Sequence, residues 1–321
     1  MKALISAVLL AATLTAAAAQ PYPARPVTMV LPYPPGGPTD AVARILAEGM
    51  RVALHQPVII DNVAGASGSI GAGRVARAVP DGYTVVFGNW GSHVVNAAVY
   101  ALPYDVVGDF APVALVGNQP LLIVGRKTLP AQDLTQLIAW VKANPGKATA
   151  GGAGAGSANH IASVFFEKET RTRLQFVPYR GGAIAMQDLL AGQIDLIFDL
   201  AASALPQVRA GTIKAFAVMA GNRAAAAPDI PTVDEAGLPG LHVSLWSAVW
   251  APKGTPGDAV AALNGAVVAS LADPTVRQRL ADLGQELPPR DQQTPEELAA
   301  LQQAEIAKWW PIIRAANIKA E

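Results

Sequence analysis

The chain has 321 residues, of which 51% are hydrophobic, and its 24 basic and 24 acidic residues give a formal net charge of zero. Nucleic-acid-binding proteins normally present a basic surface, so this balance argues against nucleic acid as a partner. The sequence contains no cysteine, which excludes disulfides and thiolate metal sites. A chain of this length can bury a large core, and we expect two domains.

Residues 1–20 have the pattern of a secretory signal peptide. Lys2 precedes an apolar run, and a tract of alanines with possible Ala-x-Ala cleavage sites follows it. The run is too short for a stable membrane span. We therefore expect residues 1–20 to be cleaved and the mature protein to be periplasmic. The alternative is an ordered N-terminal helix.

The mature chain opens with a strand, a loop and a helix. Residues 27–31 form the apolar strand and residues 32–38 a Pro/Gly loop, after which apolar residues recur every three to four positions, as in a helix. The candidate caps of this helix are Gly37, with Pro38 as the first helical residue, Thr39 and Asp40. A glycine loop that enters a helix leaves free backbone N–H groups, so this turn predicts an anion site.

Strands and helices then alternate along the chain. We expect strands over residues 57–62, 83–88, 121–124, 148–151, 174–178, 194–198, 214–219 and 243–251, and helices over residues 70–78, 129–143, 161–169, 183–191 and from 295 to a break or kink at Pro311. This alternation is typical of α/β folds with largely parallel sheets. A second glycine loop, residues 152–156, leads into a helix capped by Ser157 or Asn159. Two such loops suggest two similar lobes with a cleft between them.

Other polar side chains follow predicted strands, at the sheet edge where open α/β folds bind ligands. Ser92 and His93 are ligand candidates, or else Ser92 caps a helix and His93 packs on it. Asp199 bonds a ligand or caps the next helix. His160 is a neutral donor to a ligand or packs near Phe176, because the start of a helix disfavours an imidazolium.

Signals for catalysis are weak. The glycine loops fit neither GxxxxGK[ST] nor GxGxxG, and no serine lies in a GxSxG turn. The four histidines form neither HxxxH nor HxH, which argues against a zinc site. We therefore expect that the protein is not an enzyme and that it binds neither a metal nor a cofactor. The alternative is an α/β hydrolase-like enzyme with an unrecognised site.

The chain resembles the periplasmic solute receptors of tripartite tricarboxylate transporters, also called Bug or TctC proteins. The motifs that carry the resemblance are YPARPVTMVLPYPPGGPTD, DGYTVVFG, LPYDVVGDFAPVALV, ANPGKATAGGAGAGSANHIASVFF, FVPYRGGAIAMQDLLAGQIDLIFD, PDIPTVDEAGLPG and WSAVWAPKGTP. The resemblance implies a two-lobed Venus-flytrap α/β fold, type II-like, with two mostly parallel sheets flanked by helices and a ligand cleft between the lobes. We expect residues 21–120 and 244–321 to form lobe 1 and residues 121–243 to form lobe 2.

The resemblance also implies that two loops grip a ligand carboxylate through main-chain amides, hydroxyls and ordered water. Its ligand-binding residues, carried over by position, are Tyr33, Gly37, Pro38, Thr39, Asp40, Trp90, Ser92, Gly156, Ser157, Asn159, His160 and Asp199. Trp90 departs from the family pattern and would narrow the pocket or stack on a ligand. Asp40 either stabilises its own helix as a first-turn carboxylate or receives the ammonium group of an amino-acid ligand.

The implied function is capture of a small carboxylate, an organic acid or amino acid, and its delivery to membrane transporter subunits. A sensor without transport is a further alternative. We expect a monomer with a hinge at residues 116–122 and 241–247. One helix terminus favours an anion by about 0.3–1 kcal/mol, whereas micromolar binding needs about 8 kcal/mol. Amide hydrogen bonds and lobe closure must therefore supply the remainder.

Overall fold

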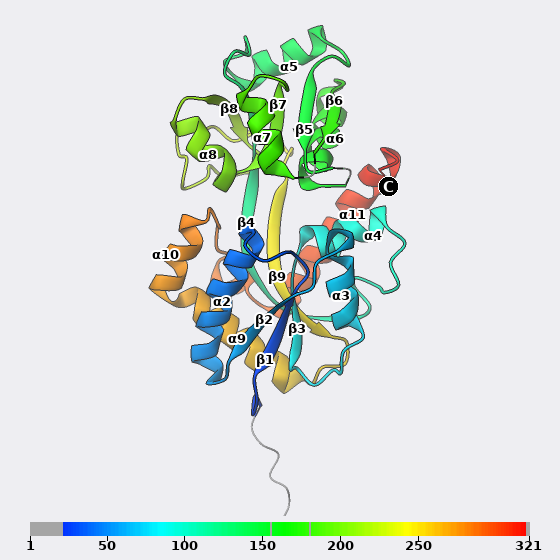
Figure 1. Ribbon diagram of the computed structural model, residues 1–321, viewed down its shortest axis with the longest axis vertical. Helices are drawn as coiled ribbons and strands as arrows, with labels where there is room; N and C mark the ends of the chain where they lie inside the picture. Colours follow the sequence, from blue (N-terminus) through cyan, green and yellow to red (C-terminus); the bar gives the residue numbers. More distant parts are fainter. Residues whose placement is uncertain (1–21, 155, 180, 319–321) are drawn as a thin grey trace, which may run out of the picture.

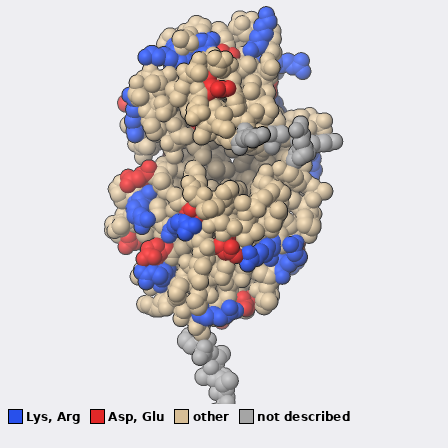
Figure 2. Space-filling view, viewed as in Figure 1, with Lys and Arg blue, Asp and Glu red and all other residues tan. Residues whose placement is uncertain are grey.

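The computed structural model describes residues 22–154, 156–179 and 181–318. Two α/β lobes are stacked along the longest axis of the molecule, and two long strands run between them (Figure 1). A space-filling view shows a hollow between the lobes, and its visible rim is mostly uncharged (Figure 2). The predicted two-lobed α/β fold is thus confirmed. The predicted signal peptide at residues 1–20 lies outside the described residues.

Strands and helices alternate through most of the chain. The strands are β1 (Val27–Leu31), β2 (Val58–Asn62), β3 (Thr84–Asn89), β4 (Phe110–Arg126), β5 (Thr149–Gly152), β6 (Gln175–Pro178), β7 (Leu196–Leu200), β8 (Ile213–Val218) and β9 (Ser244–Pro252). The α-helices are α2 (Pro38–Leu54), α3 (Ser69–Ala76), α4 (Asn96–Val99), α5 (Leu134–Ala143), α6 (Ala158–Thr170), α7 (Gly182–Leu190), α8 (Ala201–Arg209), α9 (Gly257–Ala272), α10 (Pro274–Asp282) and α11 (Pro295–Ala315). Short 3₁₀ segments are η1 (Ala66–Gly68) and η3 (Arg290–Gln292), and η2 (Gly91–Val95) is a π-helical turn.

The strands join in the order β2-β1-β3-β9-β4-β7-β5-β6, and β8 also pairs with β4. Pairing is parallel between β1 and its neighbours and between β5 and its neighbours. The long strands β4 and β9 instead pair antiparallel with each other, β4 also with β7 and β8, and β9 with β3. The sheets are therefore mixed and not mostly parallel as predicted. Residues 110–120 of β4 pair with β9, whereas residues 121–126 pair with β7 and β8. One unbroken strand therefore belongs to the sheets of both lobes.

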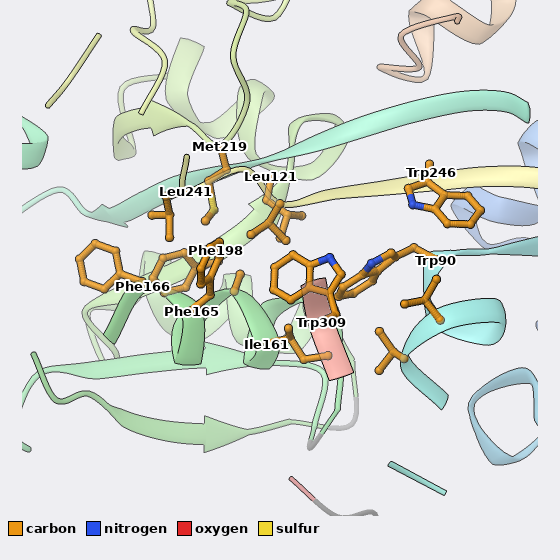
Figure 3. Packing of buried hydrophobic residues seen from close by; sticks show 14 of the residues in the cluster. Trp90, Leu121, Ile161, Phe165, Phe166, Phe198, Met219, Leu241, Trp246 and Trp309 are labelled. Carbon is orange, nitrogen blue, oxygen red and sulfur yellow. The ribbon is translucent and has the colours of Figure 1, made fainter. Parts of the chain in front are cut away.

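Aromatic side chains fill the core where the lobes meet (Figure 3). Trp309 on α11 makes edge-to-face contacts with Trp90, at 5.3 Å between ring centroids, and with Phe165 on α6, at 5.1 Å. Such aromatic pairs add stability beyond their area burial. The C-terminal helix thus packs on residues of both lobes.

Helix α11 begins as predicted, because Thr294 accepts a hydrogen bond from the Glu297 N–H at 3.2 Å. Of the predicted break or kink at Pro311, the break does not occur, since the helix continues to Ala315. Tertiary packing of the last turns, including buried Ile313, compensates for the backbone bond that proline lacks.

Among the described helices, no single one is long and apolar enough to cross a membrane. Helices α9 and α10 meet that criterion only when taken together, and they are bent by 76° relative to each other.

Candidate functional site

The loop between β1 and α2 leads into a helix start whose amide groups are not capped by any side chain. Gly37 is the N-cap, with extended backbone angles and no side-chain cap, and Pro38 is the first helical residue. Of the predicted alternatives, this confirms the cap by Gly37. Because Pro38 has no N–H, the first free amide groups of the helix belong to Thr39 and Asp40. These amides point out of the positive end of a 17-residue helix.

The Asp40 carboxylate holds this loop together. Its Oδ2 accepts hydrogen bonds from the Gly36 N–H at 3.0 Å and from Arg44 Nε at 2.8 Å, and its Oδ1 accepts one from Asn62 Nδ2 at 3.0 Å. Hydrogen bonds lower the pKa of Asp40 to about 2, chiefly the bond from Arg44 and to a lesser extent those from Asn62 and the Gly36 N–H. Only 4% of the residue is exposed. Asp40 therefore stabilises its own helix start, and its contact with a ligand amine stays a prediction.

Asparagines at two strand ends support the same loop. Asn62, which ends β2, also donates to the Tyr33 carbonyl oxygen at 3.1 Å. Asn89, which ends β3, accepts from the Tyr33 hydroxyl at 2.6 Å and from the Ser92 N–H at 3.2 Å. Neither asparagine is among the predicted site residues, although both lie at the carboxyl ends of predicted strands, which was the available signal.

The loop between β5 and α6 is the counterpart in the second lobe. Ser157 is the N-cap of α6, and its Oγ accepts from the His160 N–H at 3.3 Å. The Gly156 N–H donates to His160 Nδ1 at 3.1 Å, and the ring stacks on Phe176 at 4.2 Å. Burial lowers the pKa of His160. With Nδ1 accepting, the proton of the neutral ring lies on Nε2, so His160 both packs and retains a donor.

Asn159 and Asp199 lie deeper beneath this loop. Asn159 Nδ2 donates to the Phe198 carbonyl oxygen at 2.5 Å, and the residue is 9% exposed. Asp199 accepts from the Leu200 N–H at 2.9 Å and from the Ser203 hydroxyl at the start of α8. Burial raises the pKa of Asp199. Asp199 does not cap α8 as the predicted alternative had it, because the N-cap residue is Leu200 and has no side-chain cap. Both side chains bond to the chain itself, and their ligand contacts stay predictions.

The residues that follow β3 are more deeply buried than expected for residues that contact a ligand. Trp90 is 1% exposed and lies against Trp309, so in this structure it does not line the cleft as predicted. Ser92 is fully buried, and its Oγ accepts from the Asn89 N–H at 3.0 Å. His93 is also fully buried and stacks on Trp250 at 3.8 Å between ring centroids. His93 is therefore packed, whereas Ser92 does not cap the following helical turn, whose N-cap residue is Trp90 without a side-chain cap. Ligand contacts of Ser92 and His93 stay predictions.

The start of α2 and the loop before α6 lie on opposite sides of the space between the lobes (Figure 1). A Cβ atom added to Gly156 would lie 3.4 Å from Val99 on α4, so the second loop reaches the other lobe. Between residues 32 and 42 the sequence has no lysine or arginine. An anion bound here would be held by amides, hydroxyls and a neutral imidazole. Among the described residues, no cluster of His, Asp or Glu could hold a metal ion.

Comparison with known proteins identifies relatives along nearly the whole chain. A family model described as "Tripartite tricarboxylate transporter family receptor" matches residues 42–318. A UPF0065 protein of Agrobacterium vitis, encoded in the TAR-I ttuE-ttuC' intergenic region, is 38% identical over 97% of this chain and 91% of its own length.

Solved structures agree with this match. MatC of Rhodopseudomonas palustris, solved with bound malate, is 39% identical with a TM-score of 0.79, over 91% of this chain and 100% of that one. Another protein of that organism, solved with adipate, is 34% identical with a TM-score of 0.81, over 93% and 100% of the two chains.

Proposed function

The chain belongs to the tripartite tricarboxylate transporter receptor family, and we propose that it captures a small carboxylate between its lobes and presents it to a membrane transporter. Its family comprises extracytoplasmic solute receptors, not enzymes. The observation that carries the proposal is the pair of helix starts, those of α2 and α6, on opposite sides of the space between the lobes (Figure 1), where Figure 2 shows a hollow. Helix N-termini bind anions through free amides and the positive end of the dipole.

The proposed carboxylate accepts hydrogen bonds from the amides of Thr39 and Asp40 on one side. On the other side the donors are the Ser157 hydroxyl, which uses its oxygen for the cap and keeps its proton, and His160 Nε2–H. All four groups are neutral or main-chain donors. Binding thus requires no buried cation, whose desolvation would oppose it.

Lobe closure supplies the remaining affinity in this proposal. The candidate hinge is where β4 and β9 cross between lobes, at residues 116–122 and 241–247. A register shift between Leu115 and Gly117 in the β4–β9 pairing supports a bend at this point. We likewise propose residues 21–120 and 244–321 as lobe 1 and residues 121–243 as lobe 2, since the change of pairing partners within β4 supports that division.

Small dicarboxylates are the first ligand candidates, because relatives were solved with malate and with adipate. We also propose export to the periplasm by cleavage of residues 1–20, and action as a monomer. Transfer of the ligand to transporter subunits follows from the family's role as a receptor.

Thermal unfolding of residues 21–321 with a panel of carboxylates and their amides tests the proposal. A ligand at about 100 times its dissociation constant adds about 2.7 kcal/mol, which corresponds to several degrees. The protein is first unfolded and refolded to release any bound ligand. Stabilisation by one carboxylate class and not by its amides supports the receptor; no stabilisation by any carboxylate refutes it.

A matched pair of capping variants localises the site. Ser157→Ala and Thr294→Ala each remove a side-chain cap, and each should cost about 1 kcal/mol of stability. Only Ser157→Ala should also weaken ligand binding, because Thr294 caps α11. Equal ligand affinity in the two variants would exclude Ser157 from the site.

A further inference from the structure

A second cavity lies outside the space between the two ligand loops. It has a volume of about 690 Å³ and is bordered by α6, the turn at residues 239–240 and the last turns of α11. Small-molecule sites typically occupy about 300–1,000 Å³. None of the residues predicted to bind the carboxylate lines this cavity, so it is not part of the proposed receptor site.

Lys308 brings a positively charged ammonium group to the wall of this cavity. Its Nζ donates to the His242 carbonyl oxygen at 2.9 Å and lies 5.3 Å from the Phe165 ring centroid and 4.7 Å from that of Trp309. No described carboxylate forms an ion pair with Lys308. Its half-buried position lowers the pKa of the ammonium, which the charge of Glu305 partly offsets.

The other charges at the cavity cancel. Lys168 and Glu169 are neighbours on α6 and form an ion pair at 2.9 Å. The described lining residues therefore carry a net charge of plus one, contributed by Lys308. Since an ammonium group has three N–H donors and Lys308 uses one of them on His242, two remain for an anion.

The remaining walls are mainly apolar. Val164 and Phe165 line the cavity from α6, and Pro311, Ile312 and Ala315 line it from α11. Ile312 is partly exposed, as is Val164, so a ligand with a hydrocarbon body would remove their side chains from water. One cation beside an apolar surface is complementary to an anion with an apolar body.

We propose that this cavity is a second ligand site, for a small amphipathic carboxylate whose anionic group pairs with Lys308 and whose hydrocarbon part covers Val164 and Ile312. The site combines α6 of one lobe with α11, which also packs against Trp90 in the other lobe through Trp309. A ligand here contacts helices of both lobes.

Calorimetric titration with 4-phenylbutyrate tests the site, and 4-phenylbutanamide is the matched neutral ligand. We expect saturable binding of the carboxylate and about tenfold or greater weakening for the amide, because a hydrogen bond to a charged group contributes on this scale. Amide NMR signals of Gly240 and Ala316 should shift on binding, whereas those of Thr39 and Gly156 should not. No heat of binding, equal affinity of the two ligands, or shifts confined to Thr39 and Gly156 would each overturn the proposal.

Three lysine variants separate charge from folding. Lys308→Gln should weaken 4-phenylbutyrate binding about tenfold, and Lys308→Arg should restore most of it because the charge is kept. Lys142→Gln, at an exposed position on α5, is the control and should leave binding unchanged. If Lys308→Gln does not fold, the affinities of Lys308→Arg for 4-phenylbutyrate and 4-phenylbutanamide still test the role of the charge. Equal affinity for the carboxylate and the amide would overturn the assignment.

Discussion

Replacement of Asp40 by asparagine should destabilise the protein in a pH-dependent way. The pKa of the carboxyl falls from 3.8 to about 2 in the folded protein, chiefly through its bond with Arg44, and this shift corresponds to about 2 kcal/mol at neutral pH. Arg44 is half-exposed, with 53% of its side chain accessible, so solvent screens part of the interaction. We therefore expect Asp40→Asn to cost about 1–2 kcal/mol at pH 7.

The pH dependence has a defined sign. Because the folded pKa is below the unfolded value, the stabilisation is fully present above about pH 4 and is lost as the pH falls toward 2. Urea unfolding of wild type and Asp40→Asn at pH 7 and pH 3 measures this. The difference between the two proteins should shrink by about 1 kcal/mol at pH 3.

A control variant separates the specific role of Asp40 in its loop from the general effect of removing a carboxylate. Asp133 caps α5 and accepts from the Gln136 N–H at 2.7 Å, and Asp133→Asn should cost little because asparagine caps equally well. A difference between wild type and Asp40→Asn that is the same at both pH values would refute the role assigned to Asp40.

Three further predictions concern the packing around the site. Gly71→Ala should cost about 1–3 kcal/mol in chemical unfolding, because its new Cβ would lie 2.7 Å from the Val63 carbonyl oxygen and 2.8 Å from Pro32. Gly265 is an exposed helix position, and a Cβ added there would have nothing within 4 Å. Gly265→Ala should therefore stabilise the protein by about 0.5–1 kcal/mol; stability changes of the same sign in the two variants would contradict the predicted clash at Gly71. Trp309→Ala should cost about 3–5 kcal/mol, as expected for a fully buried aromatic side chain; a loss below about 1 kcal/mol would mean that α11 does not hold the lobes together. Burial lowers the pKa of His93 to about 3, so this group should lower wild-type stability by up to about 1.4 kcal/mol per pH unit below pH 6.5. His93→Gln should flatten that slope in unfolding at pH 7, 6 and 5, and an unchanged slope would assign it to other groups.

Local patterns predicted the elements that begin and end within a short stretch. The strand over 27–31 and the helix start at Gly37 and Pro38 follow from apolar spacing and capping preferences, which depend on near neighbours. The first part of β4 was missed because Pro112, Gly117 and Pro120 interrupt its sequence like turn residues. Pairing with β9 overrides those signals, and register shifts near Pro112 and Gly117 accommodate them.

Contacts between residues far apart in the sequence determine the surroundings of the predicted site residues, which local patterns could not predict. Trp90 follows a strand end, a typical place for a ligand contact, but Trp309 from the last helix covers it. Asp40 could be placed in the first turn from sequence, whereas its bond to Asn62 depends on the pairing of β1 with β2. For His160 the predicted packing on Phe176 is confirmed, and Nε2–H has no acceptor among the described residues, so the donor role stays a prediction.

Hydrogen–deuterium exchange with and without a bound dicarboxylate tests the central claim most directly. If one carboxylate bridges the two helix starts, saturation with the ligand found in the thermal panel should slow exchange in peptides covering residues 33–41 and 156–161 together. The same experiment on Ser157→Ala should show a weaker response in both segments. Protection in only one segment, or in neither while the ligand stabilises the protein, would contradict capture of a carboxylate between the lobes.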